Sequence, residues 1–243
     1  MVSNNKKIIG LIGQTELPAF AVFDFDNTCI SNDITEATLA YMASNNLFKD
    51  KNLLGGKFKN LNDDLYSKSI FKNYYNLLKE NKTKEAYKFI SKILSNYSVD
   101  EIGLLASKVV KATKKLKPKK QIIELINLLK KNGIEVWIVS ASIEPLVEET
   151  MKYFNINAKL LGVRNVITKD KITAKLEKPI PMFEGKVACI KKFINSKKIP
   201  DLGVGDSLND LPMLEYCKIK AIVGKKSSLI RKGEKNNWFM YNI

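Results

Sequence analysis

Carboxylates and hydroxyls that could bind a metal and attack a substrate occur at three widely separated places in the chain. Asp24 and Asp26 bracket one phenylalanine, Ser140 stands far downstream, and Asp206 and Asp210 form a third group. Carboxylate oxygens are the ligands that a hard cation such as Mg²⁺ prefers. A carboxylate can also act as a nucleophile or as a general acid and base. These residue types predict metal-assisted chemistry if the fold brings them together.

The spacing suits attack on phosphorus. Asp24 and Asp206, which come from different segments, can hold Mg²⁺ while one of them forms a bond to phosphorus. Asp26 can protonate the leaving alkoxide and later take a proton from water. Ser140 and a lysine can bind the remaining phosphoryl oxygens and offset their charge.

Apolar segments that alternate with helical patterns predict the elements that position these groups. The predicted strands are Phe20–Asp26, Ile134–Val139, Leu202–Gly205 and Ala221–Val223. The predicted helices are Lys119–Lys131, one from near Pro145, and Gly185–Asn195. Two strand-like pieces flank a predicted hairpin turn, namely Lys159–Thr168 and Lys171–Glu177. This alternation predicts an α/β fold, a Rossmann-like parallel sheet with helices on both faces.

Each of the three polar groups falls at the end of a predicted strand. In an open parallel sheet, the carboxyl ends of neighbouring strands form the ligand crevice. We therefore expect these side chains to lie close together, although they are far apart in the sequence.

The chain changes character between Asp33 and about Lys115. Its apolar residues recur at helical spacing, and three further helices are predicted there, namely Leu61–Lys79, Lys84–Ser95 and Val99–Lys114. No convincing strand occurs in this stretch. We therefore expect residues 1–32 and 116–243 to form the α/β core domain, and residues 33–115 to form an inserted helical cap.

Four segments together resemble the haloacid-dehalogenase-like (HAD) hydrolase superfamily. They occur in the family's order, and they are Asp24-Phe25-Asp26-Asn27-Thr28, Ser140, Phe183-Glu184-Gly185-Lys186 and Gly205-Asp206-Ser207-Leu208-Asn209-Asp210. The resemblance covers nearly the whole chain. The helical insertion and the hairpin region before Lys186 resemble the phosphoserine-phosphatase-like branch. The resemblance implies a Mg²⁺-dependent phosphoric monoester hydrolase that works through an aspartyl-phosphate.

The resemblance also implies a role for each matched charged residue. Asp24 is the nucleophile and a metal ligand, and Asp26 is the acid and base, whose backbone carbonyl also binds the metal. Lys186 offsets the charge on Asp24 and on the phosphate. Asp206 is the second metal carboxylate, and Asp210 either supports the metal or orients Lys186.

We expect substrate contacts from four matched positions and from one residue of the cap, namely Thr28, Ser140, Ala141, Asn209 and Asp33. By resemblance, Thr28 supports the phosphate loop and Ser140 binds phosphate. The aspartate at position 26 favours cleavage of a phosphate ester, because dehalogenase and phosphonate-cleaving relatives lack an aspartate there.

The cap sequence leaves several substrates open. In phosphoserine phosphatases a cap glutamate receives the substrate ammonium and a cap arginine clamps its carboxylate. Asp33 falls where that acid would be, with Glu36 near, but no arginine precedes Arg164, so the bidentate clamp is missing. Carboxylates beside aromatic rings could instead bind the ammonium of phosphocholine or phosphoethanolamine. The cap aromatics could also simply pack the cap core; they are Tyr41, Phe58, Tyr66, Phe71, Tyr74 and Tyr75.

The formal net charge of +16 comes almost entirely from lysine, since only Arg164 and Arg231 are arginine. Nucleic-acid-binding proteins favour arginine, because its guanidinium makes paired hydrogen bonds to bases and phosphates. Because arginine is scarce here and no nucleic-acid-binding motif occurs, we favour the interpretation that the lysines solvate helix surfaces. We expect a small phosphorylated metabolite as partner, without nucleic acid or membrane. Two alternatives to a phosphatase remain, namely a phosphotransferase or mutase that uses the same aspartyl-phosphate, and a lysine-rich nucleic-acid-binding protein.

The N-terminal segment and the cysteines favour a cytoplasmic location. Ile8–Ile12 follows two lysines, as in a weak signal peptide, but cleavage after Ala21 would cut a predicted buried strand. No apolar run approaches the roughly 18–20 residues that span a bilayer. The three cysteines are scattered and lack metal-ligand spacing, which fits free thiols in a reducing cytosol; they are Cys29, Cys189 and Cys217.

Overall fold

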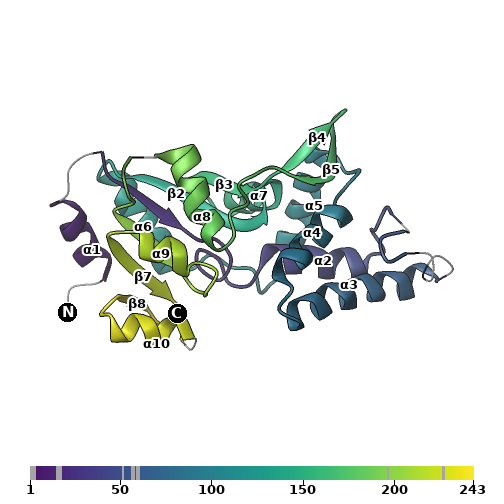
Figure 1. Ribbon diagram of the computed structural model, residues 1–243, viewed down its shortest axis with the longest axis horizontal. Coiled ribbons are helices and arrows are strands. Elements are labelled where there is room, and N and C mark those ends of the chain that lie inside the picture. Colours follow the sequence, from purple (N-terminus) through teal and green to yellow (C-terminus); the bar gives the residue numbers. More distant parts are fainter. Residues whose placement is uncertain are drawn as a thin grey trace.

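The computed structural model describes residues 4–14, 18–50, 52–55, 58, 61–195, 197–225 and 228–243. A parallel sheet lies at the centre of the core, with strand order β3-β2-β1-β6-β7-β8 (Figure 1). In that order the strands are Lys159–Val163, Glu135–Ile143, Phe20–Phe23, Leu202–Gly205, Ile219–Val223 and Phe239–Tyr241. Residues that follow β1 and β6 therefore lie at the carboxyl ends of the two central strands of the sheet.

Helices cover both faces of this sheet. Successive residues of a strand point to opposite faces, and in β1 Ala21 and Phe23 join one buried cluster while Phe20 and Val22 join another. The first face carries α1 (Asn4–Ile12), α6 (Lys120–Lys131) and α7 (Glu144–Tyr153). The second carries α8 (Glu184–Cys189), a π-helical turn (Ile190–Ile194), α9 (Leu211–Tyr216) and α10 (Ser228–Lys235). The predicted α/β fold class is confirmed.

The inserted stretch folds into helices that lie together beside the core (Figure 1). They are α2 (Ile34–Ser44), α3 (Asp63–Lys79), α4 (Thr83–Ile93) and α5 (Val99–Ala112). Asp33, Asn62 and Ser98 begin α2, α3 and α5, because each side chain accepts a hydrogen bond from a backbone N–H of the first turn. Helix α5 packs against α7 and so attaches this group of helices to the core.

A two-stranded hairpin, β4 (Asn165–Thr168) and β5 (Lys171–Leu176), leaves the core and packs against α4. Its Ile172 accepts a backbone hydrogen bond from Asn96 at 2.8 Å and donates one to Tyr97 at 2.8 Å. The hairpin thus contacts the helices of the insertion, although its sequence lies within 116–243. The division into domains at residues 33 and 115 stays a prediction.

Three of the predicted strands have different bounds in the structure. Strand β1 ends at Phe23, so Asp24 and Asp26 follow it and do not lie within it. Strand β2 continues to Ile143, so Ser140 lies inside the strand and not after it, and its pairing with β3 shifts register between Val139 and Ile143. The expected strand Lys159–Thr168 is interrupted at Arg164, where the chain passes from β3 in the large sheet to β4 in the hairpin.

Elements near the two ends of the chain, α1, α10 and β8, were not predicted. Ile8 and Ile12 of α1 are buried, and Asn5 accepts a hydrogen bond of 2.5 Å from the hydroxyl of Tyr241 in β8. These contacts join the first and last elements of the core. Across the residues that the structure describes, no helix has both the length and the apolar character that crossing a bilayer requires.

Candidate active site

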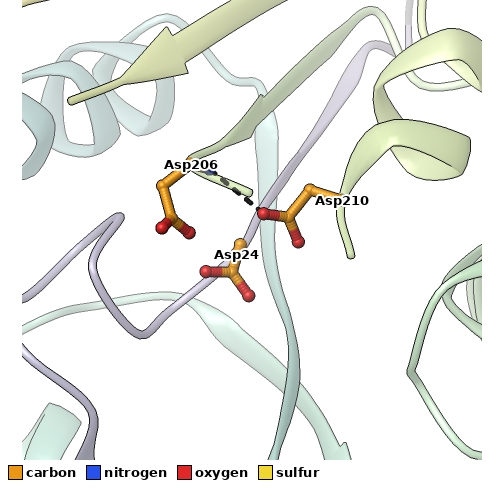
Figure 2. A group of neighbouring side chains, drawn as sticks. All are labelled: Asp24, Asp206 and Asp210. Carbon is orange, nitrogen blue, oxygen red and sulfur yellow. Dashed lines mark hydrogen bonds between the residues drawn. The ribbon is translucent and has the colours of Figure 1, made fainter. Parts of the chain in front are cut away.

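Three carboxylates meet where β1 and β6 end. Asp24 follows β1 and Asp206 follows β6, and the backbone N–H of Asp24 still donates to the carbonyl of Val204 at 2.9 Å. Asp210 lies at the start of α9. One carboxylate oxygen from each aspartate lies within 4.8 Å of the other two (Figure 2). The convergence expected from the sheet edge is therefore present.

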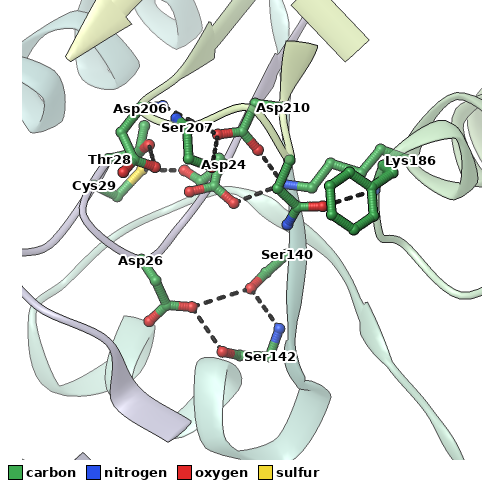
Figure 3. Close-up of polar contacts among 12 residues, drawn as sticks. Asp24, Asp26, Thr28, Cys29, Ser140, Ser142, Lys186, Asp206, Ser207 and Asp210 are labelled. Carbon is green, nitrogen blue, oxygen red and sulfur yellow. Dashed lines mark hydrogen bonds and ion pairs between the residues drawn. The ribbon is translucent and has the colours of Figure 1, made fainter. Parts of the chain in front are cut away.

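Lys186 lies between two of these carboxylates. Its Nζ is 2.6 Å from Asp24 Oδ1 and 2.6 Å from Asp210 Oδ1, and the side chain is fully buried (Figure 3). Burial alone would lower the pKa of Lys186, but Asp210 and Asp24 together raise it above its usual range. The ammonium therefore stays charged and fixes the direction of the Asp24 side chain.

The segment before Lys186 has a backbone path that places this lysine. Phe183 has a positive φ of 51°, and its N–H donates to Asn209 Oδ1 at 2.7 Å. A Cβ on Gly185 would lie 1.9 Å from the carbonyl oxygen of Ile180, so only glycine fits there. Asn209, expected to contact substrate, uses its side-chain oxygen to support the Lys186 loop in this structure.

Asp210 has no carboxylate oxygen without a partner. While Oδ1 accepts from Lys186, Oδ2 accepts from the backbone N–H groups of Asp206 and Ser207 and from the Ser207 hydroxyl, at 3.0, 3.1 and 3.2 Å. This arrangement suits the role of orienting Lys186 and the Asp206 loop. Thr28 donates to Asp206 Oδ1 at 3.3 Å and so supports the same loop from the other side.

The cluster carries more negative charge than its single lysine offsets. Burial raises the pKa of Asp24 to about 6 and that of Asp206 to about 8, and repulsion from neighbouring carboxylates adds to both. With all three carboxylates ionised, the single ammonium would leave two negative charges, which one divalent cation would neutralise. Oxygen donors alone suit Mg²⁺, so the residues present fit the metal, with Asp24 and Asp206 as the carboxylates free to hold it.

Asp26 is held on the cap side of Asp24. Its Oδ1 accepts from the backbone N–H of Ile34 at 2.8 Å, and its Oδ2 accepts from Ser142 at 2.7 Å and, more weakly, from Ser140 at 3.4 Å (Figure 3). Burial, and then repulsion from Asp33 and Asp24, raise the pKa of Asp26 well above its usual range. A carboxyl that keeps its proton near neutral pH suits a general acid.

The expected phosphate-binding residues lie in β2 beside Asp26. Ser140 is fully buried, and its hydroxyl accepts from the backbone N–H of Ser142 at 3.0 Å. Ala141, 5% exposed, lies between the two serines, and only its backbone could contact phosphate. Ser142 was not among the predicted site residues. A serine two positions after Ser140 was the available signal, since alternate residues of a strand share one face.

The cap helices present carboxylates and tyrosines toward these groups. The Asp33 side chain caps α2 by accepting from the N–H of Glu36 at 2.9 Å, and burial raises the pKa of Asp33 to about 7. Burial, followed by the Asp33 carboxylate, also raises the pKa of Tyr74 and of Tyr87. Glu36 accepts from the hydroxyl of Tyr75 at 3.1 Å. Asp33 therefore has two tyrosine hydroxyls within electrostatic reach.

The six cap aromatics named from the sequence pack in or against the hydrophobic core. Tyr66 and Tyr74 are buried in it, and the partly buried ones that pack against it are Tyr41, Phe58, Phe71 and Tyr75. Tyr66 packs the cap core, where its hydroxyl bonds the backbone of Asp50 and Leu53. Tyr87, which was not predicted, lines a cavity of about 440 Å³ between α4 and the segment before α8. After burial, Asp33 and Tyr74, the charges of Asp26 and Asp24 also raise the pKa of Tyr87, so its hydroxyl lies within electrostatic reach of the catalytic carboxylates.

Comparison with known proteins agrees with this geometry. Residues 21–215 match the haloacid dehalogenase-like hydrolase family. The phosphorylcholine phosphatase of Pseudomonas aeruginosa is 25% identical over 238 aligned residues, which cover 78% of this chain and 68% of that protein.

Solved structures share the fold at lower identity. A protein of unknown function from Bordetella pertussis Tohama I superposes with a TM-score of 0.77 and 15% identity, over 92% of this chain and 98% of that one. A substrate-bound phosphoserine phosphatase superposes with a TM-score of 0.61 and 17% sequence identity, over 94% of this chain and 95% of that one. The predicted enzyme class, a phosphoric monoester hydrolase, is confirmed. The family match spans most of the sequence, and the chain belongs to the haloacid dehalogenase-like hydrolase family.

Proposed function

We propose that this enzyme hydrolyses a small phosphomonoester whose alcohol carries an ammonium group, such as phosphorylcholine or phosphoethanolamine, through an aspartyl-phosphate. The observation that carries the proposal is the Asp24 carboxylate, whose Oδ1 is held by Lys186 while Asp26 stands beside it. Oδ1 is engaged, so the second oxygen of Asp24 is available to attack phosphorus.

In the first step, this Asp24 oxygen forms a bond to phosphorus and the ester P–O bond breaks. The leaving oxygen takes the proton of Asp26, which gives the free alcohol and the aspartyl-phosphate. The Lys186 ammonium offsets the charge of the phosphoryl group, and the Ser140 hydroxyl can turn from its long contact with Asp26 to donate to a phosphoryl oxygen.

In the second step, Asp26 acts as a base. It takes a proton from water while the water oxygen bonds to phosphorus, and the bond between phosphorus and Asp24 breaks. Inorganic phosphate leaves, and the Asp24 carboxylate and protonated Asp26 are restored. Mg²⁺, held by Asp24, Asp206 and the Asp26 carbonyl, would supply positive charge to the phosphoryl oxygens.

The cap face supports an ammonium-bearing substrate. Asp33 and Glu36 supply negative charge, and the half-buried Tyr87, which lines the neighbouring cavity, supplies an aromatic ring within electrostatic reach of Asp33. Tyr74 is 2% exposed and packs in the core. Aromatic rings and carboxylates together attract a quaternary or primary ammonium. The chain has no arginine before Arg164 to clamp a carboxylate, and the relative from Pseudomonas aeruginosa is named for phosphorylcholine. These points favour phosphorylcholine or phosphoethanolamine over phosphoserine.

A substrate panel tests the proposal. Phosphate release would be measured with Mg²⁺ for phosphorylcholine, phosphoethanolamine, phosphoserine and glycerol phosphate. We expect kcat/KM to be highest for phosphorylcholine and phosphoethanolamine, whose alcohols carry an ammonium group but no carboxylate. Faster turnover of phosphoserine or glycerol phosphate would contradict the substrate assignment. Phosphate transfer to an added alcohol in place of release would indicate a phosphotransferase. The exclusion of nucleic-acid and membrane partners and the cytoplasmic location stay predictions.

A further inference from the structure

The carboxyl group of Asp26 accepts hydrogen bonds from two different parts of the fold. On one side, the N–H of Ile34, the first residue of α2, donates to Oδ1 at 2.8 Å. On the other side, the Ser142 hydroxyl in β2 donates to Oδ2 at 2.7 Å. The Thr35 hydroxyl, again from the first turn of α2, donates to Ser142 Oγ at 2.8 Å. Thr35 and Ser142 are 2% and 1% exposed, so water does not compete for these bonds.

We propose that Ser142 is a positioning residue for proton transfer, and that Thr35 acts through it, so that the chain Thr35–Ser142–Asp26 aims the acid at the leaving oxygen. This inference rests on the proposed phosphatase function. It concerns the orientation of Asp26 and not the identity of the substrate.

The two serines of β2 then have different tasks. The hydroxyl of Ser140 lies 3.4 Å from Asp26 Oδ2, a long and weak hydrogen bond, and we expect this hydroxyl to turn to the phosphate. Ser142 has the short contact and keeps Asp26 in place when Ser140 turns away. Its own hydroxyl is directed by the donor from Thr35, so rotation of Ser142 would lose two hydrogen bonds at once.

The same contacts determine where the proton sits. Both lone-pair directions of Oδ2 face serine hydroxyls, and one direction of Oδ1 is filled by the Ile34 N–H. While Ser140 keeps its contact, the remaining position, on Oδ1, is the one left for the transferable proton; once Ser140 turns to the phosphate, a position on Oδ2 opens as well. An Asp26 side chain that rotates freely would lose this direction, and general acid catalysis depends on such geometry.

The experiment varies how much the leaving group needs a proton. Phosphorylcholine releases an alkoxide that must be protonated, whereas 4-nitrophenyl phosphate releases a stabilised anion. We compare kcat/KM, because it reports the step that breaks the ester bond. Ser142→Ala is expected to lower kcat/KM about 10–100-fold for phosphorylcholine, part of the 10²–10⁴-fold that general acids supply, and less than about 3-fold for the aryl ester.

A second readout separates the two chemical steps. Asp26 must also take a proton from water, so the second step slows in the variant whichever ester is used. With the aryl ester, Ser142→Ala should therefore release a burst of nitrophenol equal to the enzyme concentration, followed by slow turnover. A preparation that had merely lost folded molecules would keep the wild-type time course, scaled to the remaining active enzyme, with unchanged steady turnover per active site.

Two further variants control for the loss of a buried hydroxyl. Thr38→Ala removes a hydroxyl on the same helix that donates to the carbonyl of Ile34 at 2.8 Å, and the two esters should keep the wild-type rate ratio. Thr35→Val keeps the shape of the side chain and should show the pattern of Ser142→Ala in weaker form. The double variant Ser142→Ala, Thr35→Val should match Ser142→Ala alone, since Thr35 acts through Ser142.

The outcomes distinguish this inference from the proposed function. Equal loss for both esters in Ser142→Ala, or in Thr35→Val if the alanine variant does not fold, would overturn the positioning role while leaving the phosphatase intact. A wild-type enzyme that releases phosphate from neither ester would overturn the proposed function itself.

Discussion

The variant Asp24→Asn separates the catalytic role of the buried carboxylates from their effect on stability. It keeps the shape of the side chain and an oxygen that can accept from Lys186, but it removes the nucleophile, so we expect phosphatase activity to be lost. We expect stability to rise in the absence of a divalent cation. The ionised Asp24 side chain is buried beside the carboxylates of Asp206 and Asp210, and its replacement relieves their repulsion.

The magnitude follows from the pKa of Asp24, which burial raises from 3.8 to about 6. The folded protein therefore binds this proton more tightly than the unfolded chain. The contribution of Asp24 to the free energy of unfolding is therefore complete at pH values below 3.8, its pKa in the unfolded chain, and is lost as the pH rises through about 6. A difference of roughly two units, at about 1.4 kcal/mol each, gives about 3 kcal/mol. In a chain of this length, that predicts a Tm about 6–12 °C above wild type at alkaline pH.

Thermal unfolding followed by circular dichroism, with excess chelator at pH values of about 4 and about 8, measures this difference. The matched control is Asp201→Asn. Asp201 is also fully buried, but it accepts from the Phe20 N–H at 3.0 Å and from Lys218 at 2.8 Å, so its replacement should destabilise the protein. Added Mg²⁺ should stabilise wild type more than Asp24→Asn. An Asp24→Asn protein less stable than wild type at pH 8 in chelator, or one with normal turnover, would refute the reasoning.

Two other changes probe the charges around the site. Lys186→Met should abolish turnover and lower the free energy of unfolding in urea by about 3–5 kcal/mol, because it leaves Asp24 and Asp210 buried without their shared ammonium. The control is Lys232→Met, at a half-exposed lysine paired with Glu215, and it should change stability little. The KM for phosphorylcholine should rise as the pH falls through about 7, because burial raises the pKa of Asp33 to about 7 and the protonated form no longer attracts the ammonium. Initial rates measured against pH give this change in KM. Neither wild type with glycerol phosphate nor the variant Asp33→Asn should show it. Parallel profiles of KM against pH for phosphorylcholine and glycerol phosphate would contradict the role of Asp33.

Much of the core could be predicted because its strands are short buried apolar runs between helical patterns. The end of β2 could not, since Ser140, Ala141 and Ser142 are small and lack the apolar alternation that marks a strand. Tertiary contacts, including the hydrogen bond between Thr35 and Ser142, keep this segment extended and buried. Strand β8 is only three residues long, too short for a pattern to emerge.

The carboxylates of the site could be predicted because they follow strands that neighbour each other in a parallel sheet. Their hydrogen-bond partners could not. Ser142 meets Thr35 only because α2 lies against β2, and nothing in either local sequence specifies that placement. Tyr87 was missed for the same reason: its position relative to Asp33 depends on how α4 packs over the core, which is a non-local property.

The hairpin that leaves the sheet has a consequence for how the helical part of the molecule can move. The polypeptide crosses between the two parts near Asp33, near Lys115, and again on either side of β4 and β5, where Arg164 and Glu177 are joined by a backbone hydrogen bond of 2.8 Å. The bonds of Ile172 to Asn96 and Tyr97 tie the hairpin to the helices. A displacement of these helices relative to the sheet must therefore either carry the hairpin along or break the two bonds of Ile172.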